Sequence, residues 1–327
     1  MTHPSIICTE THARQKAMLQ TALDGPVRRA LDAPDTLEIL ANPDGSVWIE
    51  RAGLGLIRAG ERLEAPERGR IIRLVASAAG EPCDRNAPIV SAELPGTGER
   101  FEGILPPVSE APCFSIRKPA ATPFTLGDYV RSGALAPATA LALRQALEDR
   151  QNIVIAGGTS SGKTTFANAL LAEPAIAGDR IVILEDTREL RCRAPDVTQL
   201  RTHRAGVTLR DLVRSTLRLR PDRIVVGEVR GGEALDLLKA WNTGHPGGLT
   251  TLHANSASGV FSRLENLVAE ATVTLPFSLI GDAVDIIVFL SRRSGERRVE
   301  EALRVTGFDE NGYRTQPLTA PNLAAIS

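Results

Sequence analysis

The chain has 327 residues, of which 43% are hydrophobic, 24% charged and 4% aromatic, and its formal net charge at pH 7 is −1. This length suggests two domains, each large enough to bury a core. The near-zero net charge argues against a protein that coats nucleic acid through bulk electrostatics, so we do not expect direct nucleic-acid binding.

The four cysteines are widely spaced and include no Cys-x-x-Cys pair, which disfavours a zinc site, and a chain of this size does not need a disulfide framework. The N-terminal segment lacks the apolar stretch of a signal peptide. The longest apolar run, 283–290, contains Asp285 and is too short to span a bilayer. We therefore expect a cytoplasmic protein, with peripheral contact to a membrane left open.

Residues 1–115 have the pattern of a small α+β domain. Helical spacing of apolar residues alternates there with short β-branched runs and glycine-containing turns. In chain order we expect a helix at 14–30, a turn at 42–45, a strand at 46–50, a helix at 66–79 and two short strands on either side of 95–98.

Prolines between 105 and 123 separate this unit from the rest, so 116–136 is the expected linker and 137–327 the second domain. Apolar strands and helices then alternate, which predicts a mostly parallel sheet covered on both faces. From 284 onward we expect antiparallel strands. The predicted strands are 152–156, 181–185, 223–228 and 250–254, and the predicted helices are 137–150, 163–171, 208–219, 232–242 and 257–271.

The segment GGTSSGKT at 157–164 fits the phosphate-loop pattern G-x-x-x-x-G-K-[ST]. Its glycines let backbone N–H groups turn toward phosphate oxygens, Lys163 reaches the β- and γ-phosphates, and Thr164 ligates Mg²⁺. The strand before the loop and the helix after it disfavour the alternative of a glycine turn with an unrelated lysine. We expect a bound nucleoside triphosphate, with contacts from Gly157, Gly158, Thr159, Ser160, Ser161, Gly162, Lys163, Thr164 and Thr165.

Two predicted strands end in acidic residues: Glu185 and Asp186 close one strand, and Glu228 closes another. The carboxyl ends of parallel strands form the ligand-binding edge of an open sheet. There, one carboxylate can orient an attacking water and another can hold Mg²⁺, often through waters. The alternative is a solvated acid at a strand end, which is less favoured when two occur beside a phosphate loop.

His253 is expected near the end of the fourth strand, so it should face the same edge. The alternative is a core or capping histidine. The glycines and threonines before it favour a turn that approaches the γ-phosphate, and His245 lies in that turn.

The region 188–223 is rich in arginine. On the helix predicted at 208–219, Arg210, Arg214 and Arg218 share one face, and Thr208 with Asp211 forms a plausible capping box. The arginines fit either a solvated face or a subunit interface. The region lacks the interleaved aromatic residues that nucleic-acid-binding proteins usually use.

In chain order, these segments resemble the secretion ATPase superfamily that powers type II and type IV secretion and conjugation. The loop at 157–165 is similar to its Walker A motif, ILEDTREL at 183–190 to its Asp box, LRLRPDRIVVGEVRGGEA at 217–234 to its Walker B motif, and TGHPGGLTTLHAN at 243–255 to its His box. Segments 37–51, 94–108 and 114–130 resemble the TrbB group of conjugative-transfer ATPases.

The resemblance implies an α/β fold with a RecA-like C-terminal ATPase domain, a smaller N-terminal α+β domain, and a homohexameric ring at the cytoplasmic face of the inner membrane. It implies that Lys163 and Thr164 bind phosphate and Mg²⁺, and that Glu185 and Glu228 polarise water or link to the metal. His253 then senses the γ-phosphate. Arg117 and Arg131 match arginines that reach the nucleotide. The chain lacks the tetracysteine module of pseudopilus-assembly ATPases, which argues against that branch.

The leading hypothesis is therefore an ATP-hydrolysing motor of a type IV secretion or conjugative transfer system, with inner-membrane components as partners. A pilus-retraction ATPase shares the chemistry but is disfavoured by the N-terminal segments. A nucleotide-dependent scaffold without turnover remains open, because acids at strand ends do not prove hydrolysis. A GTPase switch predicts an N-K-x-D motif, which the sequence lacks.

Overall fold

The computed structural model describes residues 14–118, 124–203, 206–293 and 296–319. The chain divides into two compact units, Met1–Thr122 and Pro123–Ser327. The division falls inside the segment 116–136 that we expected as a linker. That segment also contains the end of strand β6 (Cys113–Arg117) and all of helix α4 (Leu126–Arg131).

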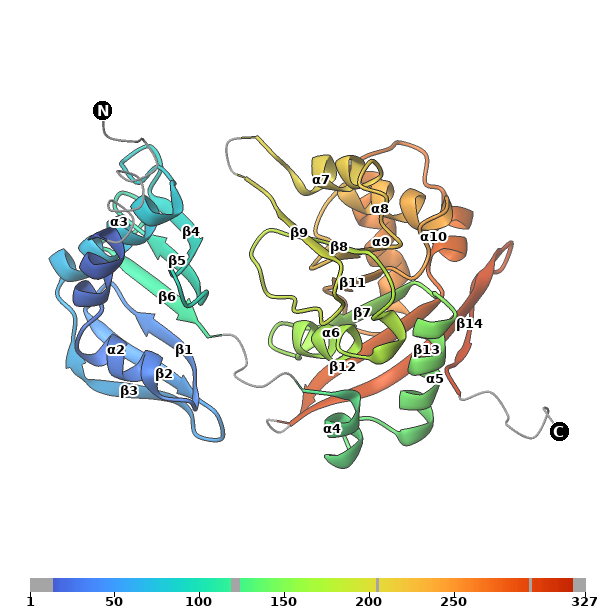
Figure 1. The fold of residues 1–327 in the computed structure, drawn as a ribbon, viewed down its shortest axis with the longest axis horizontal. Helices are drawn as coiled ribbons and strands as arrows, with labels where there is room; N and C mark the ends of the chain where they lie inside the picture. Colours follow the sequence, from blue (N-terminus) through green and yellow to red (C-terminus); the bar gives the residue numbers. More distant parts are fainter. Residues whose placement is uncertain (1–13, 119–123, 204–205, 294–295, 320–327) are drawn as a thin grey trace. The chain divides into compact units, whose positions relative to one another are not determined.

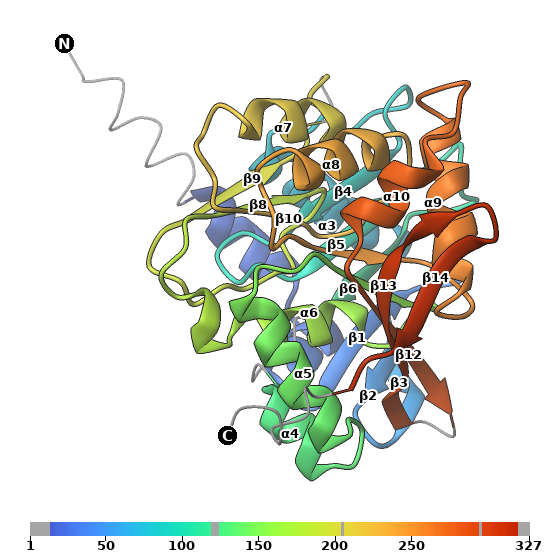
Figure 2. The same cartoon turned by 90° about the vertical axis from the view of Figure 1, so that its right-hand side faces the viewer.

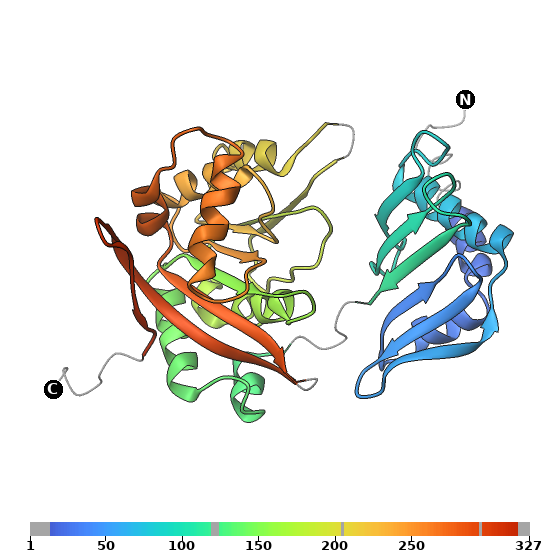
Figure 3. The ribbon, with the colours of Figure 1, turned by 180° about the vertical axis from the view of Figure 1, so that it is seen from behind.

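The first unit is a six-stranded antiparallel sheet with helices, as the α+β pattern predicted (Figures 1 and 3). Helix α3 (Ala65–Ala79) buries Ile71, Ile72 and Val75 against the sheet. The other elements are α2 (Pro26–Asp32), β1 (Thr36–Ala41), β2 (Ser46–Arg51), β3 (Gly55–Arg62), β4 (Ile89–Glu93) and β5 (Arg100–Ile104), and the strand order is β3-β2-β1-β6-β5-β4.

The prediction of one helix at 14–30 is wrong. Residues 14–22 are helical, a turn follows at 23–25, and α2 then begins at Pro26. Gly25 has a φ of 95°, which a helix cannot contain, and proline suits the first position of a new helix.

The second unit is an eight-stranded sheet with the order β14-β13-β12-β7-β11-β10-β8-β9. Six neighbouring strands, from β12 to β9, run parallel, whereas β13 pairs antiparallel with β12, and β14 pairs antiparallel with β13. The strands are β7 (Ile153–Gly157), β8 (Ile181–Glu185), β9 (Val197–Arg201), β10 (Arg223–Val226), β11 (Leu249–Leu252), β12 (Ile286–Arg293), β13 (Glu296–Asp309) and β14 (Gly312–Pro317).

The antiparallel pairing predicted from 284 onward is confirmed, since β12 pairs with β13 and β13 pairs with β14 in this way. The sequence did not predict that β12 also pairs in parallel with β7, with Ile286 opposite Ile153. The run 286–290 is apolar on both faces of the sheet, which is typical of a parallel strand buried between helices. Strand β12 therefore joins the parallel strands to the antiparallel strands β13 and β14.

Helices cover both faces of this sheet, as the alternating pattern predicted (Figure 2). Along β7, Ile153 and Ile155 point into one core, and Val154 and Ala156 point into the other. The first core contains residues of α4, α5 (Pro137–Glu148) and α6 (Lys163–Leu171), and the second contains residues of α7 (Leu209–Thr216), α8 (Glu233–Asn242), α9 (Gly259–Ala269) and α10 (Phe277–Ala283).

Because β7, β8, β10 and β11 are parallel, their carboxyl ends lie at one edge of the sheet. The residues that follow these strands therefore meet there. In the parts of the chain that the structure describes, no helix combines the length and the apolar character needed to cross a bilayer.

Candidate active site

The phosphate-loop sequence connects β7 to α6, as predicted. Gly157 cannot carry a side chain, since a Cβ there would lie 2.4 Å from the carbonyl oxygen of Leu290. Ser160 and Gly162 have φ angles of 59° and 95°, so the chain curls through left-handed conformations before α6 starts at Lys163. Such a curl at a helix N-terminus forms an anion-binding nest.

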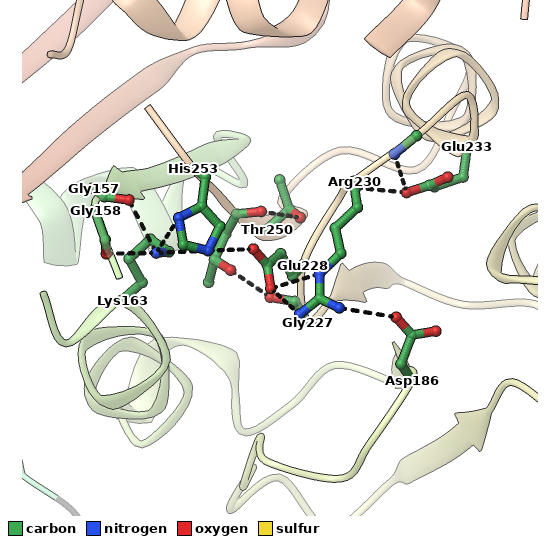
Figure 4. A network of polar contacts seen from close by, with 12 residues as sticks. Gly157, Gly158, Lys163, Asp186, Gly227, Glu228, Arg230, Glu233, Thr250 and His253 are labelled. Atoms are coloured by element: carbon green, nitrogen blue, oxygen red, sulfur yellow. Dashed lines mark hydrogen bonds and ion pairs between the residues drawn. The ribbon is translucent and has the colours of Figure 1, made fainter. Parts of the chain in front are cut away.

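Lys163 is nearly buried at the centre of this loop. Its Nζ donates to the carbonyl oxygens of Gly157 and Gly158, at 3.0 and 2.9 Å. The same Nζ lies 3.4 Å from Nδ1 of His253 (Figure 4). The ammonium group is therefore held over the loop.

Glu228 and His253 meet beside Lys163, from the ends of β10 and β11. Nε2 of His253 lies 2.9 Å from Oε1 of Glu228. Burial and the nearby charge of Lys163 lower the pKa of His253, and Glu228 only partly opposes them. The imidazole is therefore neutral at pH 7, so one ring nitrogen donates and the other can accept.

Arg230 completes this cluster, and the sequence analysis did not single it out. Its Nε and Nη2 donate to Oε2 of Glu228 at 2.9 and 2.6 Å, and its Nη1 lies 3.9 Å from Oδ2 of Asp186. The Glu228 carboxylate thus lies between Arg230 on one side and His253 with Lys163 on the other (Figure 4). The only available signal was the position of Arg230, two residues after the strand-end acid.

Glu185 is almost fully buried at the end of β8. Its Oε1 accepts the backbone N–H groups of Glu189 and Leu190, at 2.9 and 2.8 Å. Its Cγ would lie 2.9 Å from a Cβ on Gly227, so this glycine lets the Glu185 side chain pass beside β10. The carboxylate therefore shapes the loop after β8 and lies next to the backbone that carries Glu228.

The glycine turn before β11 does not approach the phosphate loop, which corrects an expectation. Gly248 immediately precedes β11, whereas His253 follows it, so the glycines and His245 belong to the opposite edge of the sheet. A Cβ on Gly248 would lie 1.9 Å from Nε1 of Trp241. Glycine is needed there because the indole ring covers the backbone.

Arg117 and Arg131 belong to different units of the chain. Arg117 ends β6 in the first unit, opposite Glu38 and Arg100 on the neighbouring strands. Arg131 ends α4 in the second unit and forms an ion pair with Asp128.

Another arginine contacts the phosphate loop. Nε of Arg297, on β13, donates to the carbonyl oxygen of Ser160 at 3.2 Å. Its Cδ lies 3.1 Å from the place where a Cβ on Gly162 would stand. Spacing in the sequence gives no signal for this contact, because it depends on the pairing of β13 with β12.

The arginine face of α7 is partly paired within the chain. Arg210 and Arg214 both contact the Asp236 carboxylate on α8, at 2.7 and 2.9 Å. The predicted capping box of Thr208 and Asp211 is confirmed. These two arginines therefore join α7 to α8, whereas Arg218 lies beyond the end of α7 at Thr216, two residues outside the helix predicted to include it.

Known proteins resemble this chain in sequence. Residues 84–311 match the family model described as type II/IV secretion system protein. The chain is 48% identical to the conjugal transfer protein TrbB of Rhizobium radiobacter, over 94% of this chain and 95% of that one. It is 31% identical to the type IV secretion system protein VirB11 of Bartonella quintana, over 87% and 92% of the two chains.

The fold has solved counterparts. The ATPase DotB of Legionella pneumophila superposes with a TM-score of 0.60 at 21% identity, covering 87% of this chain and 80% of that one. This likeness confirms the expected pairing of an N-terminal domain with a RecA-like domain. With the family match over most of its length and the near full-length likeness to TrbB, the chain belongs to the type II/IV secretion system protein family.

Proposed function

We propose that the chain binds ATP with Mg²⁺ at the phosphate loop and hydrolyses it. The observation that carries this proposal is the meeting of Lys163, His253 and Glu228, whose contacts measure between 2.9 and 3.5 Å. A cation, a neutral imidazole and a carboxylate suit phosphoryl transfer, because one can hold phosphate and the others can position water.

Each group has a proposed task. Lys163 exchanges the loop carbonyls for phosphate oxygens, and the backbone N–H groups from Gly158 to Thr165 surround the same anion. Glu228 orients the attacking water through its carboxylate. The single N–H of neutral His253 faces Glu228 in the structure and turns toward the γ-phosphate when nucleotide is bound.

The donor set fits Mg²⁺, which favours hydroxyl, carboxylate and phosphate oxygens. Thr164 in the first turn of α6 supplies a hydroxyl, and Glu228 or Glu185 supplies a carboxylate through water. When bound, the metal neutralises charge on the β- and γ-phosphates. We also propose that Arg117 and Arg131 contact the nucleotide, from the same chain or from a neighbouring copy.

We further propose that the chain is a homohexameric cytoplasmic motor of a conjugative transfer system, which contacts inner-membrane components and converts hydrolysis into domain motion. The support is the near full-length likeness to a conjugal transfer protein. That likeness disfavours pilus retraction as the role. A scaffold that binds nucleotide without turnover is the second candidate, since likeness of fold does not establish hydrolysis.

Phosphate release by the purified chain with ATP tests the proposal. We expect turnover that stops when EDTA removes Mg²⁺, together with a hexamer of about 210 kDa, six times the chain mass of 35.0 kDa, by light scattering. Binding of ATP without turnover would favour the scaffold instead.

A further inference from the structure

We propose that Arg230 is a positioning residue for hydrolysis, which holds the Glu228 carboxylate so that Oε1 faces His253 and the phosphate loop. This inference rests on the proposed function. Two N–H groups of the guanidinium, Nε and Nη2, donate to the same carboxylate oxygen, Oε2, at 2.9 and 2.6 Å. Oε1 is left for His253, at 2.9 Å.

The backbone beneath Arg230 is itself held in place. The N–H groups of Arg230 and Gly231 both donate to Oε1 of Glu233 in the first turn of α8, at 2.7 and 2.9 Å. On the other side of Glu228, the N–H of Val229 donates to the carbonyl oxygen of Thr251 at 3.1 Å. The guanidinium therefore projects from a fixed support, and its contact with Glu228 is built into the turn between β10 and α8 (Figure 4).

The charges around Glu228 explain why the carboxylate needs this contact. Lys163 lies on the side of His253, and Arg230 is the cation on the opposite side (Figure 4). Without Arg230, the Glu228 carboxylate loses its contact with this guanidinium, while the attraction of Lys163 from the side of His253 remains. Glu228 would then move toward Lys163, away from the place where it orients water.

Asp186 gives the guanidinium a second anchor. Its Oδ2 lies 3.9 Å from Nη1 of Arg230, and its Oδ1 accepts the hydroxyl of Thr202 at 3.0 Å. The arginine therefore joins the loop after β8 to the loop after β10. A lysine at this position keeps the charge but contacts the carboxylate through a single point.

Steady-state hydrolysis and nucleotide binding in Arg230→Gln test the inference. We expect kcat to fall about 10- to 100-fold while the Kd for a slowly hydrolysed ATP analogue changes less than about threefold, because misplacement of a reacting group mainly affects the chemical step. Arg230→Lys should recover part of kcat. A purely structural role predicts instead that kcat, binding and thermal stability fall together and that lysine gives no recovery.

Arg214→Gln is the matched control. The Arg214 side chain is 57% exposed and contacts the Asp236 side chain, which is 15% exposed, whereas the values for Arg230 and Glu228 are 54% and 19%. We expect kcat and Kd to stay within about twofold of the unsubstituted chain, as for other surface ion pairs. An Arg230→Gln variant that behaves like this control would overturn the inference.

A crystal structure of Arg230→Gln tests whether Arg230 holds the Glu228 carboxylate, without a measurement of hydrolysis. The inference predicts that the Glu228 carboxylate rotates toward Lys163 and His253, and a carboxylate that keeps its orientation contradicts it. If the unsubstituted chain binds ATP but releases no phosphate, the proposed hydrolysis fails, and this structure still decides the role of Arg230.

Discussion

Nε2 of His253 lies 2.9 Å from Oε1 of Glu228, although the two side chains follow different strands of the sheet. The pair joins the ends of β10 and β11 beside the ammonium group of Lys163. A neutral imidazole contacts both the ammonium and the carboxylate without adding charge. When phosphate binds at Lys163, His253 can therefore change its contact with Glu228, the group that orients water.

We therefore expect His253→Ala to lower kcat by about 10²-fold or more, the usual cost of removing one donor to a transition-state charge. Nucleotide affinity should change little, because the phosphate loop is unaltered. His253→Gln retains a donor on a side chain of similar reach and should keep more activity. Phosphate release and analogue binding, measured on the same preparations, check this; an alanine variant with unchanged kcat would remove His253 from the mechanism.

Lys163→Ala should strongly weaken nucleotide binding without unfolding the chain. The ammonium donates to the carbonyls of Gly157 and Gly158 in the ligand-free loop, but the loop curl also depends on Gly157 and Gly162. Each lost charged hydrogen bond to phosphate costs about 1.5–3 kcal/mol, or roughly 10- to 150-fold in Kd. Calorimetric titration with ADP measures this loss. Affinity equal to that of the unsubstituted chain would show that phosphate binds elsewhere.

Gly248→Ala should destabilise the second unit by about 1–3 kcal/mol or more, because the new methyl group would overlap the indole of Trp241 and the carbonyl oxygen of Ile224. Gly178→Ala is the control, since a Cβ there has no atom within 4 Å. Urea unfolding followed by Trp241 fluorescence, in a Trp48→Phe background, reports on the second unit alone. Equal midpoints for the two variants would contradict the close packing.

The pH dependence of stability should include a contribution from Asp285. Burial raises the pKa of this carboxyl group above its ordinary value, and the N–H of Asn152 and the charge of Arg304 oppose burial only in part. A raised pKa means that the folded chain binds the proton more tightly than the unfolded chain. The protonated Asp285 therefore contributes to the free energy of unfolding at low pH. This contribution is lost as pH rises from about 3.9 through the raised pKa.

Asp285→Asn keeps an oxygen that can accept the N–H of Asn152 but cannot ionise. We expect the free energy of unfolding of this variant, relative to the unsubstituted chain, to increase between about pH 4 and pH 7. Urea unfolding at several pH values in this range gives the difference. A difference that stays constant with pH would show that Asp285 titrates as an ordinary exposed carboxyl group.

Local patterns predicted much of the second unit. The run 153–157 is apolar and β-branched, the glycines and Lys163 follow it at fixed spacing, and the strand and the helix around them are confirmed. The acids Glu185 and Glu228 were identified because strand ends can be read from composition, and parallel strands bring such ends together.

Other features depend on pairing between distant segments. The parallel pairing of β12 with β7 was missed because an apolar run does not reveal its partner or its direction. Strand β9, with the polar sequence VTQLR at a sheet edge, has little strand signal. The contacts of Arg230 with Glu228 and of Arg297 with Ser160 depend on side-chain direction, which spacing alone does not give.

The nucleotide retained by Glu228→Gln tests the central claim most directly. The chain and the variant are incubated with ATP and Mg²⁺, separated from free nucleotide, denatured, and analysed for bound ATP and ADP. If Glu228 orients the attacking water, the unsubstituted chain retains mainly ADP and the variant retains mainly ATP, with comparable amounts of nucleotide in both. Equal conversion to ADP by both proteins would contradict the account.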